Sequence, residues 1–186
     1  LFLLAGAGMG LVQQQFYPSA SRSEVLVELR LREGASFTAT TAEVKRFERV
    51  LEADPDVKDY TAYTGAGSPR FFLSLGPELP NPGYAQFVVQ TAGIPEREAL
   101  RKRLIALFDA GEAFPEVRGR VQRMEFGPPV GFPVQFRVIG PDAQQVREIA
   151  HRVRDIVRGS TLVRDTHLDW DEQVRTVQVQ VDQDQA

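Results

Sequence analysis

Apolar residues alternate with polar ones from Glu24 to Glu33, which predicts a strand with one buried face. The apolar positions are Val25, Val27, Leu29 and Leu31. Downstream, Thr40 and Glu43 have the spacing of a capping box, so a helix is predicted to begin there and to run to about Ala53. Its apolar stripe would cover the buried strand face and consists of Val44, Phe47, Val50 and Leu51.

The same two kinds of pattern continue to Phe126 and complete a first unit. Strands are predicted at Val57–Thr64, Arg70–Leu75, Tyr84–Thr91 and Arg118–Phe126. Pro95 opens a second helix, whose predicted buried face is Leu100, Leu104, Leu107 and Phe108. Its predicted solvent face is basic and contains Arg97, Arg101, Lys102 and Arg103. Two successive strand-helix-strand units predict a ferredoxin-like α+β sandwich, in which one sheet carries two helices on one face.

A joint rich in proline and glycine follows, from Phe126 to Pro133, with its centre at residues 128–133. Neither a helix nor an interior strand can run through it, so we expect a rigid connector. A second unit beyond it is predicted to have a helix starting near Asp142, with Val146, Ile149, Ala150, Val153 and Val157 buried. Its predicted strands are Phe132–Ile139, Leu162–Asp169 and Val174–Asp182. These elements make half of a ferredoxin-like βαβ unit.

The first residues, Leu1 to Val12, are apolar and uncharged. A helix of this length spans only ~18 Å, whereas the hydrocarbon layer of a bilayer is ~30 Å thick. We interpret the segment as the end of a transmembrane helix within a longer polypeptide. A signal-peptide core would have a basic region before it, and a buried core helix would lose stability through its several glycines.

Composition excludes several kinds of function. With 42% hydrophobic and 25% charged residues, the chain of 186 residues is ordinary for a folded protein, and its net charge of −3 gives no reason to expect nucleic acid. An RNA-binding module on the same fold would need a basic, aromatic sheet face. The absence of cysteine excludes disulfides and thiolate metal sites. His151 and His167 lack a metal-ligand spacing, and there is no phosphate loop or nucleophile elbow, so we expect no enzyme and no cofactor.

Several short motifs, in their order along the chain, resemble the C-terminal periplasmic loop of resistance-nodulation-division multidrug efflux permeases of the AcrB/MexB-like type. The motifs are Phe16-Tyr17-Pro18-Ser19, Glu33-Gly34-Ala35-Ser36, Tyr84-Ala85-Gln86, residues 127–137 (GPPVGFPVQFR) and Val181-Asp182-Gln183-Asp184. The resemblance covers essentially the whole chain. No single motif is diagnostic, and the resemblance rests on their order.

The resemblance implies a division into four parts. Residues 1–12 would end a transmembrane helix, 13–127 would form a first porter subdomain, 128–133 the joint, and 134–186 the first half of a second porter subdomain, cut before a docking-domain insertion. The intact permease would be a proton-driven homotrimer in the inner membrane, with this region in the periplasm. Its expected partners are a periplasmic adaptor protein, an outer-membrane channel and small amphiphilic substrates.

By the same resemblance, substrates would bind in a cleft between the two porter subdomains, on sheet surfaces that no helix covers. The strand pattern places Leu26 and Glu28 on such a face, and Met124 and Phe126 on another strand of it. A mixed apolar, aromatic and charged wall suits amphiphiles with few fixed polar requirements. The open alternative is that Met124 and Phe126 belong to the core and that the polar residues face solvent.

Further site residues are carried over position by position. The family's glycine-rich switch loop corresponds to Gly65, Ala66, Gly67 and Ser68. Here the loop is shorter and has no phenylalanine, a role that Phe71 or Phe72 could take. A cleft-lining arginine corresponds to Arg164, with Thr166 on the same face, although Arg and Thr on strands are usually just exposed. A soluble ferredoxin-like ligand-binding or regulatory module remains the alternative function.

Overall fold

The computed structural model describes residues 8–9, 20–76, 78–127, 131–132, 134–170 and 177. Its elements, in chain order, are β1 (Glu24–Leu31), α2 (Phe37–Glu52), β2 (Val57–Thr64), β3 (Tyr84–Thr91), α3 (Ile94–Ala110), β4 (Val117–Arg123) and α4 (Ala143–Arg158). In the described part of the chain, no helix is long and apolar enough to cross a membrane.

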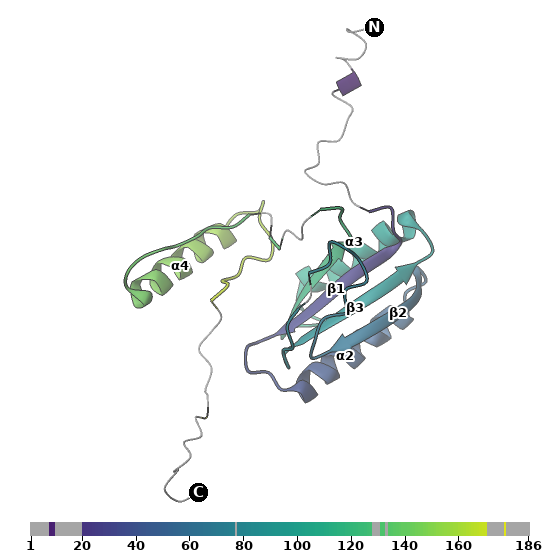
Figure 1. Cartoon of the computed structure of the whole chain (residues 1–186), viewed down its shortest axis with the longest axis horizontal. Coiled ribbons are helices and arrows are strands. Elements are labelled where there is room, and N and C mark those ends of the chain that lie inside the picture. Colours follow the sequence, from purple (N-terminus) through teal and green to yellow (C-terminus); the bar gives the residue numbers. More distant parts are fainter. Residues whose placement is uncertain are drawn as a thin grey trace, which may run out of the picture.

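The four strands form one sheet in the order β2-β3-β1-β4, and every neighbouring pair is antiparallel. Helices α2 and α3 lie on the same face of this sheet (Figure 1). Two strand-helix-strand units joined in this way give the ferredoxin-like arrangement. The α+β fold class predicted from the sequence is therefore confirmed.

Alternation along β1 places one set of residues under both helices. Val25, Val27 and Leu29 are fully buried in a cluster that also contains Phe47 of α2 and Leu100 of α3. The ring of Phe47 meets that of Phe87 edge to face, with centroids 4.9 Å apart. Each large apolar side chain buried in this way stabilises the fold by ~1.5–3 kcal/mol. No helix in the described part of the chain covers the other face of the sheet.

Helix α2 begins one turn earlier than the capping box predicts. Ser36 is the N-cap, and its Oγ accepts a hydrogen bond from the backbone N–H of Ala39 at 3.1 Å. Thr40 is buried inside the helix and donates its hydroxyl to the backbone oxygen of Pro82 at 2.6 Å. The predicted cap at Thr40 is wrong because a second hydroxyl, at Ser36, was available where the turn at Gly34 ends.

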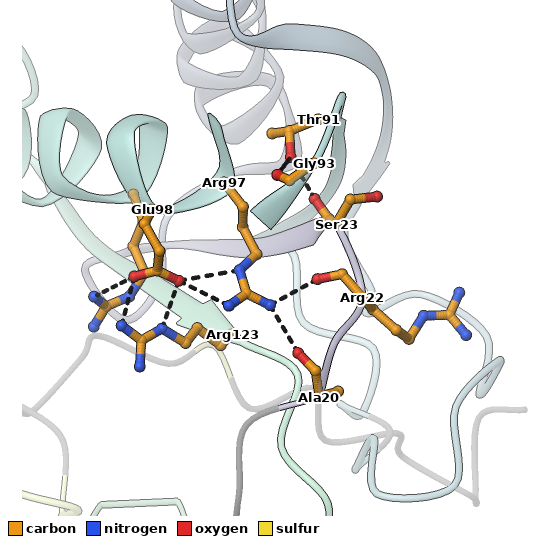
Figure 2. A network of polar contacts seen from close by, with 9 residues as sticks. Ala20, Arg22, Ser23, Thr91, Gly93, Arg97, Glu98 and Arg123 are labelled. Carbon is orange, nitrogen blue, oxygen red and sulfur yellow. Dashed lines mark hydrogen bonds and ion pairs between the residues drawn. The ribbon is translucent and has the colours of Figure 1, made fainter. Parts of the chain in front are cut away.

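Arg97 is also placed differently from the prediction. It begins the second turn of α3 but is only 3% exposed, instead of lying on the basic solvent face. Its Nη1 donates to the backbone oxygens of Ala20, at 2.8 Å, and Arg22, at 2.7 Å. Glu98 accepts from Arg97 and also from Arg123 of β4 (Figure 2). The network thus ties the segment before β1 to α3 and β4.

The segment predicted as the strand Arg70–Leu75 forms bends and turns instead, and β4 ends at Arg123. The chain between β2 and β3 therefore makes one long connection, residues 65–83, which we call the covering loop. Two of its apolar side chains, Phe72 and Leu75, pack on the sheet face without forming a strand.

The second unit is confirmed only for its helix. Asp142 caps α4 by accepting from the N–H of Gln145 at 2.9 Å, but no residue of α4 is buried. The described residues of the predicted strands Phe132–Ile139 and Leu162–Asp169 are not in strands. A strand requires a hydrogen-bonded neighbour, and none lies beside them in the described part. Val174–Asp182, apart from Val177, and Leu1–Val12, apart from residues 8 and 9, lie outside the described residues.

Candidate functional site

The helix-free face of the sheet carries the second set of alternating residues. In the strand register, Leu26 lies between Gln122 of β4 and Val88 of β3. Two positions on, Glu28 lies between Arg120 and Gln86. Leu26 and Val88 form an apolar row beside a row of polar residues, and Leu26 and Glu28 share this face as the sequence predicted.

The covering loop packs on the apolar row. Leu75, which is buried, and Phe72, which is partly buried, contact a cluster that contains Leu26 and Met124. Leu26 is 5% exposed and Met124 only 3%, so both are covered by this chain itself. Phe126 is 51% exposed and places its ring 5.9 Å from that of Phe72. Met124 is thus a core residue beneath the loop, while Phe126 extends the patch to the surface.

The predicted switch loop begins this covering loop and is held at two points. Gly65 has φ +78°, and its N–H donates to the backbone oxygen of Tyr84 at 2.7 Å. The N–H of Ser68 donates to the side-chain oxygen of Gln86 at 2.7 Å, and both residues are buried. A side chain at Gly67 would lie about 3.1 Å from Cβ of Glu78, so Gly67 permits the loop to close on itself. Ala66 lies between these anchors.

A polar cluster lies beside the apolar patch. Gln122 donates its Nε2 to Glu28 at 2.8 Å. Burial raises the pKa of Glu28, and the nearby Arg120 cation opposes this rise. The hydroxyls of Tyr84 and Ser68 are buried and have no hydrogen-bond partner among the described residues. Burial, reinforced by Glu28, raises the pKa of Tyr84, so that hydroxyl is a neutral donor. The cluster can therefore offer donors and acceptors to a bound molecule.

Replacing Glu28 with glutamine should change the dependence of stability on pH. Burial raises the pKa of Glu28 above its ordinary value of 4.5. The free energy of unfolding therefore falls as pH rises from 4.5 to the raised pKa and is constant above it. Glu28→Gln removes this fall and can still accept from Gln122. Thermal unfolding from pH 4 to 8 should show the variant gaining over the wild type as pH rises.

The exposed Glu112 gives a matched control, since Glu112→Gln removes the same charge away from the sheet face. Its difference from the wild type should not widen over this pH range. If Glu28→Gln instead loses stability increasingly as pH rises, the ionised carboxylate is stabilised by Arg120 and our interpretation is wrong.

Arg164 and Thr166 are not brought to this face. Nη1 of Arg164 lies 3.3 Å from a carboxylate oxygen of Asp109, at the end of α3, and its side chain is 72% exposed. Thr166 lines a separate cavity, between the first unit and α4. The structure therefore groups Leu26, Met124 and Phe126 with Glu28, and leaves the other two predicted residues elsewhere.

Sequence reasoning missed the buried partners of the site, Leu75, Tyr84 and Gln86. The alternation of β3 would have placed Tyr84 and Gln86 on this face, but nothing in the sequence predicts that the covering loop folds back on it. Among the described residues, no group of three or more His, Asp or Glu side chains is arranged to hold a metal ion.

Comparisons with known proteins agree with this architecture. The model of the AcrB/AcrD/AcrF family matches residues 2–186. Among solved structures, a heavy metal efflux pump matches with a TM-score of 0.51 over 84% of this chain, at 11% identity. The chain spans 17% of the length of that pump, and a match at this identity supports the fold alone. No curated protein matches the sequence. Because the family match covers nearly every residue, the chain belongs to the AcrB/AcrD/AcrF family, whose members are resistance-nodulation-division efflux permeases.

Proposed function

We propose that this chain is the porter region of a proton-driven multidrug efflux permease and that it binds amphiphilic compounds. Residues 13–127 are the first porter subdomain of its C-terminal half, and 134–186 are the first half of the second. The intact permease is a homotrimer of the inner membrane with this region in the periplasm, and it works with an adaptor protein and an outer-membrane channel. The family match over residues 2–186 supports this function over a soluble regulatory module.

One observation carries the binding role: an apolar and aromatic patch lies on the helix-free sheet face, beneath the chain's own covering loop. The patch joins Leu26 and Met124 to Phe72 and Leu75, and it continues to the exposed ring of Phe126. Methionine and aromatic side chains adapt to differently shaped partners, which suits the recognition of many compounds. The adjacent polar cluster at Glu28 supplies hydrogen bonds.

The covering loop controls access to the buried part of the patch. A ligand that reaches Leu26 or Met124 must displace Phe72 and Leu75, because these side chains occupy the apolar row. Gly65, in the left-handed region, gives the loop a backbone position that tolerates such a change. Phe126 is accessible without any motion and would make the first contact with a ligand.

Phe126→Ala in the whole permease tests this role. Phe126 is half exposed, so its replacement should leave abundance unchanged. Losing an aromatic contact at a binding surface weakens binding by ~1–2 kcal/mol, so the dye concentration for half-maximal efflux should rise by roughly tenfold. Efflux of a large amphiphilic dye from cells, at matched permease abundance, measures this concentration.

Leu79→Ala is the matched control, since it also removes a large apolar side chain, but Leu79 lies in the covering loop outside the patch and is 82% exposed. Efflux by this variant should equal that of the wild type. Equal half-maximal concentrations for both variants and the wild type would contradict binding at the patch, whatever the maximal rates are.

A further inference from the structure

The segment directly before β1, residues 20–23, lies across the end of the sheet, and we call it the entry strap. Nη1 of Arg97, in α3, donates to the backbone oxygen of Ala20 at 2.8 Å and to that of Arg22 at 2.7 Å (Figure 2). Because the guanidinium is planar and rigid, one buried side chain fixes two strap residues relative to α3.

Both ends of the entry strap are also fastened to the sheet. The N–H of Ala20 donates to the backbone oxygen of Met124, next to β4, at 2.8 Å. The backbone oxygen of Ser23 accepts from the hydroxyl of Thr91, the last residue of β3, at 2.7 Å. The strap is therefore tied to α3 and to the ends of two strands, and it keeps its place as long as these bonds hold.

The other side of the entry strap contacts the covering loop. Ala20 is 1% exposed and belongs to the same apolar cluster as Leu75, which the loop places over the sheet. The guanidinium of Arg22 lies 5.6 Å from the ring centroid of Phe72. Leu75 and Phe72 are the loop side chains that occupy the apolar patch. The strap thus supports the loop at the two residues that close this patch.

The middle of the covering loop, residues 70–76, has little hydrogen bonding of its own to hold it on the sheet. The hydroxyl of Ser74 donates to the backbone oxygen of Glu125, whereas Arg70 and the N–H of Leu75 donate to residues of the loop itself. Apolar packing therefore holds this part of the loop in place. Such packing depends on close contact, so it weakens when a neighbouring segment moves away.

We propose that the entry strap locks the covering loop over the apolar patch, so that the loop opens when the strap is released from α3. Arg97 is a positioning residue in this lock: it fixes the strap, and the strap supports Phe72 and Leu75. The lock would regulate access to the proposed binding surface, and it rests on the proposed function only in that the patch is taken as the place where ligands bind.

Labelling of single introduced cysteines in the full chain tests the lock, because the chain has no cysteine of its own. Leu26→Cys places a thiol beneath the covering loop, and Val27→Cys places one beneath the helices. A maleimide dye reacts with each thiol only when its cover opens, so the rate reports the population of the open form. Leu26→Cys should be labelled faster than Val27→Cys, since the loop opens without the helices.

Adding Arg97→Met should raise the labelling rate of Leu26→Cys by roughly tenfold or more, because the closed loop loses a support that the open loop does not have. Leu26→Cys should still be labelled faster than Val27→Cys. An unchanged rate at Leu26→Cys, or one that rises only to the rate at Val27→Cys, would overturn the lock, because the loop would then open independently of the strap or only with the whole unit. Efflux that depends on Phe126 would survive that result, which separates the lock from the proposed function.

Arg22→Gln is a milder variant that leaves the backbone bonds of the strap in place. The side chain of Arg22 is 43% exposed, so the chain should fold, and losing the contact to Phe72 should raise labelling of Leu26→Cys by about two- to fivefold. Arg46→Gln is the matched control: Arg46 also pairs with a nearby glutamate, but it lies over the ring of Phe114 on the helix side. It should leave the rate unchanged, and equal effects of the two variants would overturn the lock.

Discussion

Replacing Gly119 with alanine is expected to destabilise the first unit by roughly 1–3 kcal/mol or more. Gly119 lies in β4 opposite Leu29 of β1, on the face covered by the helices. A Cβ at this position would fall among the ring carbons of Phe108, far inside van der Waals contact. Either this ring or α3, which carries it, must therefore move to admit the Cβ. Urea unfolding of the full chain measures the loss.

A double-mutant cycle with Phe108 identifies the cause. If the clash with the ring is responsible, Gly119→Ala should cost clearly less in a Phe108→Ala background than in the wild type. Phe108→Ala alone removes contacts to Phe47 and Phe114 and is expected to destabilise as well. Strictly additive losses would mean that the glycine is needed for its backbone and not for the space above it.

The first unit was predictable because its apolar residues repeat with clear periods. The alternation in β1 gives Val25 and Val27 to the helices and Leu26 and Glu28 to the other face, as the structure has them. A shift by one residue would exchange the two faces, so the pattern determines which residues can form a site. The apolar periodicity therefore predicts the fold class and the sheet face on which Leu26 and Glu28 lie.

Periodicity, in contrast, could not predict the covering loop. Phe71, Phe72, Leu73 and Leu75 read as a strand, yet only Leu75 is buried, and Leu73 is 83% exposed. The loop is fixed by contacts distant in sequence, such as the hydroxyl of Ser74 donating to the backbone oxygen of Glu125 at 2.5 Å. Periodicity reports local structure and carries no information about such contacts.

The second unit shows a related limit. The apolar stripe of α4 predicted burial, but none of its residues is buried and Ile149 is 40% exposed. An apolar stripe indicates that a helix has a surface to bury, but it does not indicate which part of the protein covers that surface. Arg164 and Thr166 were placed on a predicted strand of this unit. Because that strand is not formed, the predicted positions of their side chains do not hold.

Arg97 was assigned to the solvent face because it is charged and lies outside the apolar stripe of its helix. Its real environment comes from residues 20–22, which lie far from it in sequence and offer backbone oxygens instead of carboxylates. A guanidinium can be buried when its donors are all directed at such acceptors. Neither the spacing nor the charge of Arg97 reveals this.

Replacing Arg97 with methionine should therefore cost on the order of 2–4 kcal/mol, since two buried backbone oxygens lose their donor. Methionine fills much of the same space, so the loss reports the hydrogen bonds more than the packing. The segment before β1 should also loosen, because the remaining bond at Ala20 runs only from its N–H to the backbone oxygen of Met124. Urea unfolding measures the first effect, and hydrogen exchange at Ala20 measures the second.

Arg103→Met is the matched control on the same helix. Arg103 pairs with Asp54 at 2.6 Å and Asp56 at 2.5 Å, but its side chain is 46% exposed. Exposed ion pairs contribute ~0–1 kcal/mol, so this variant should lose little stability and leave exchange at Ala20 unchanged. Arg97→Lys keeps the charge but cannot reach both backbone oxygens and Glu98 at once, and it should fall between wild type and Arg97→Met. Equal losses for Arg97→Met and Arg103→Met would show that the network in Figure 2 does not hold the entering segment in place.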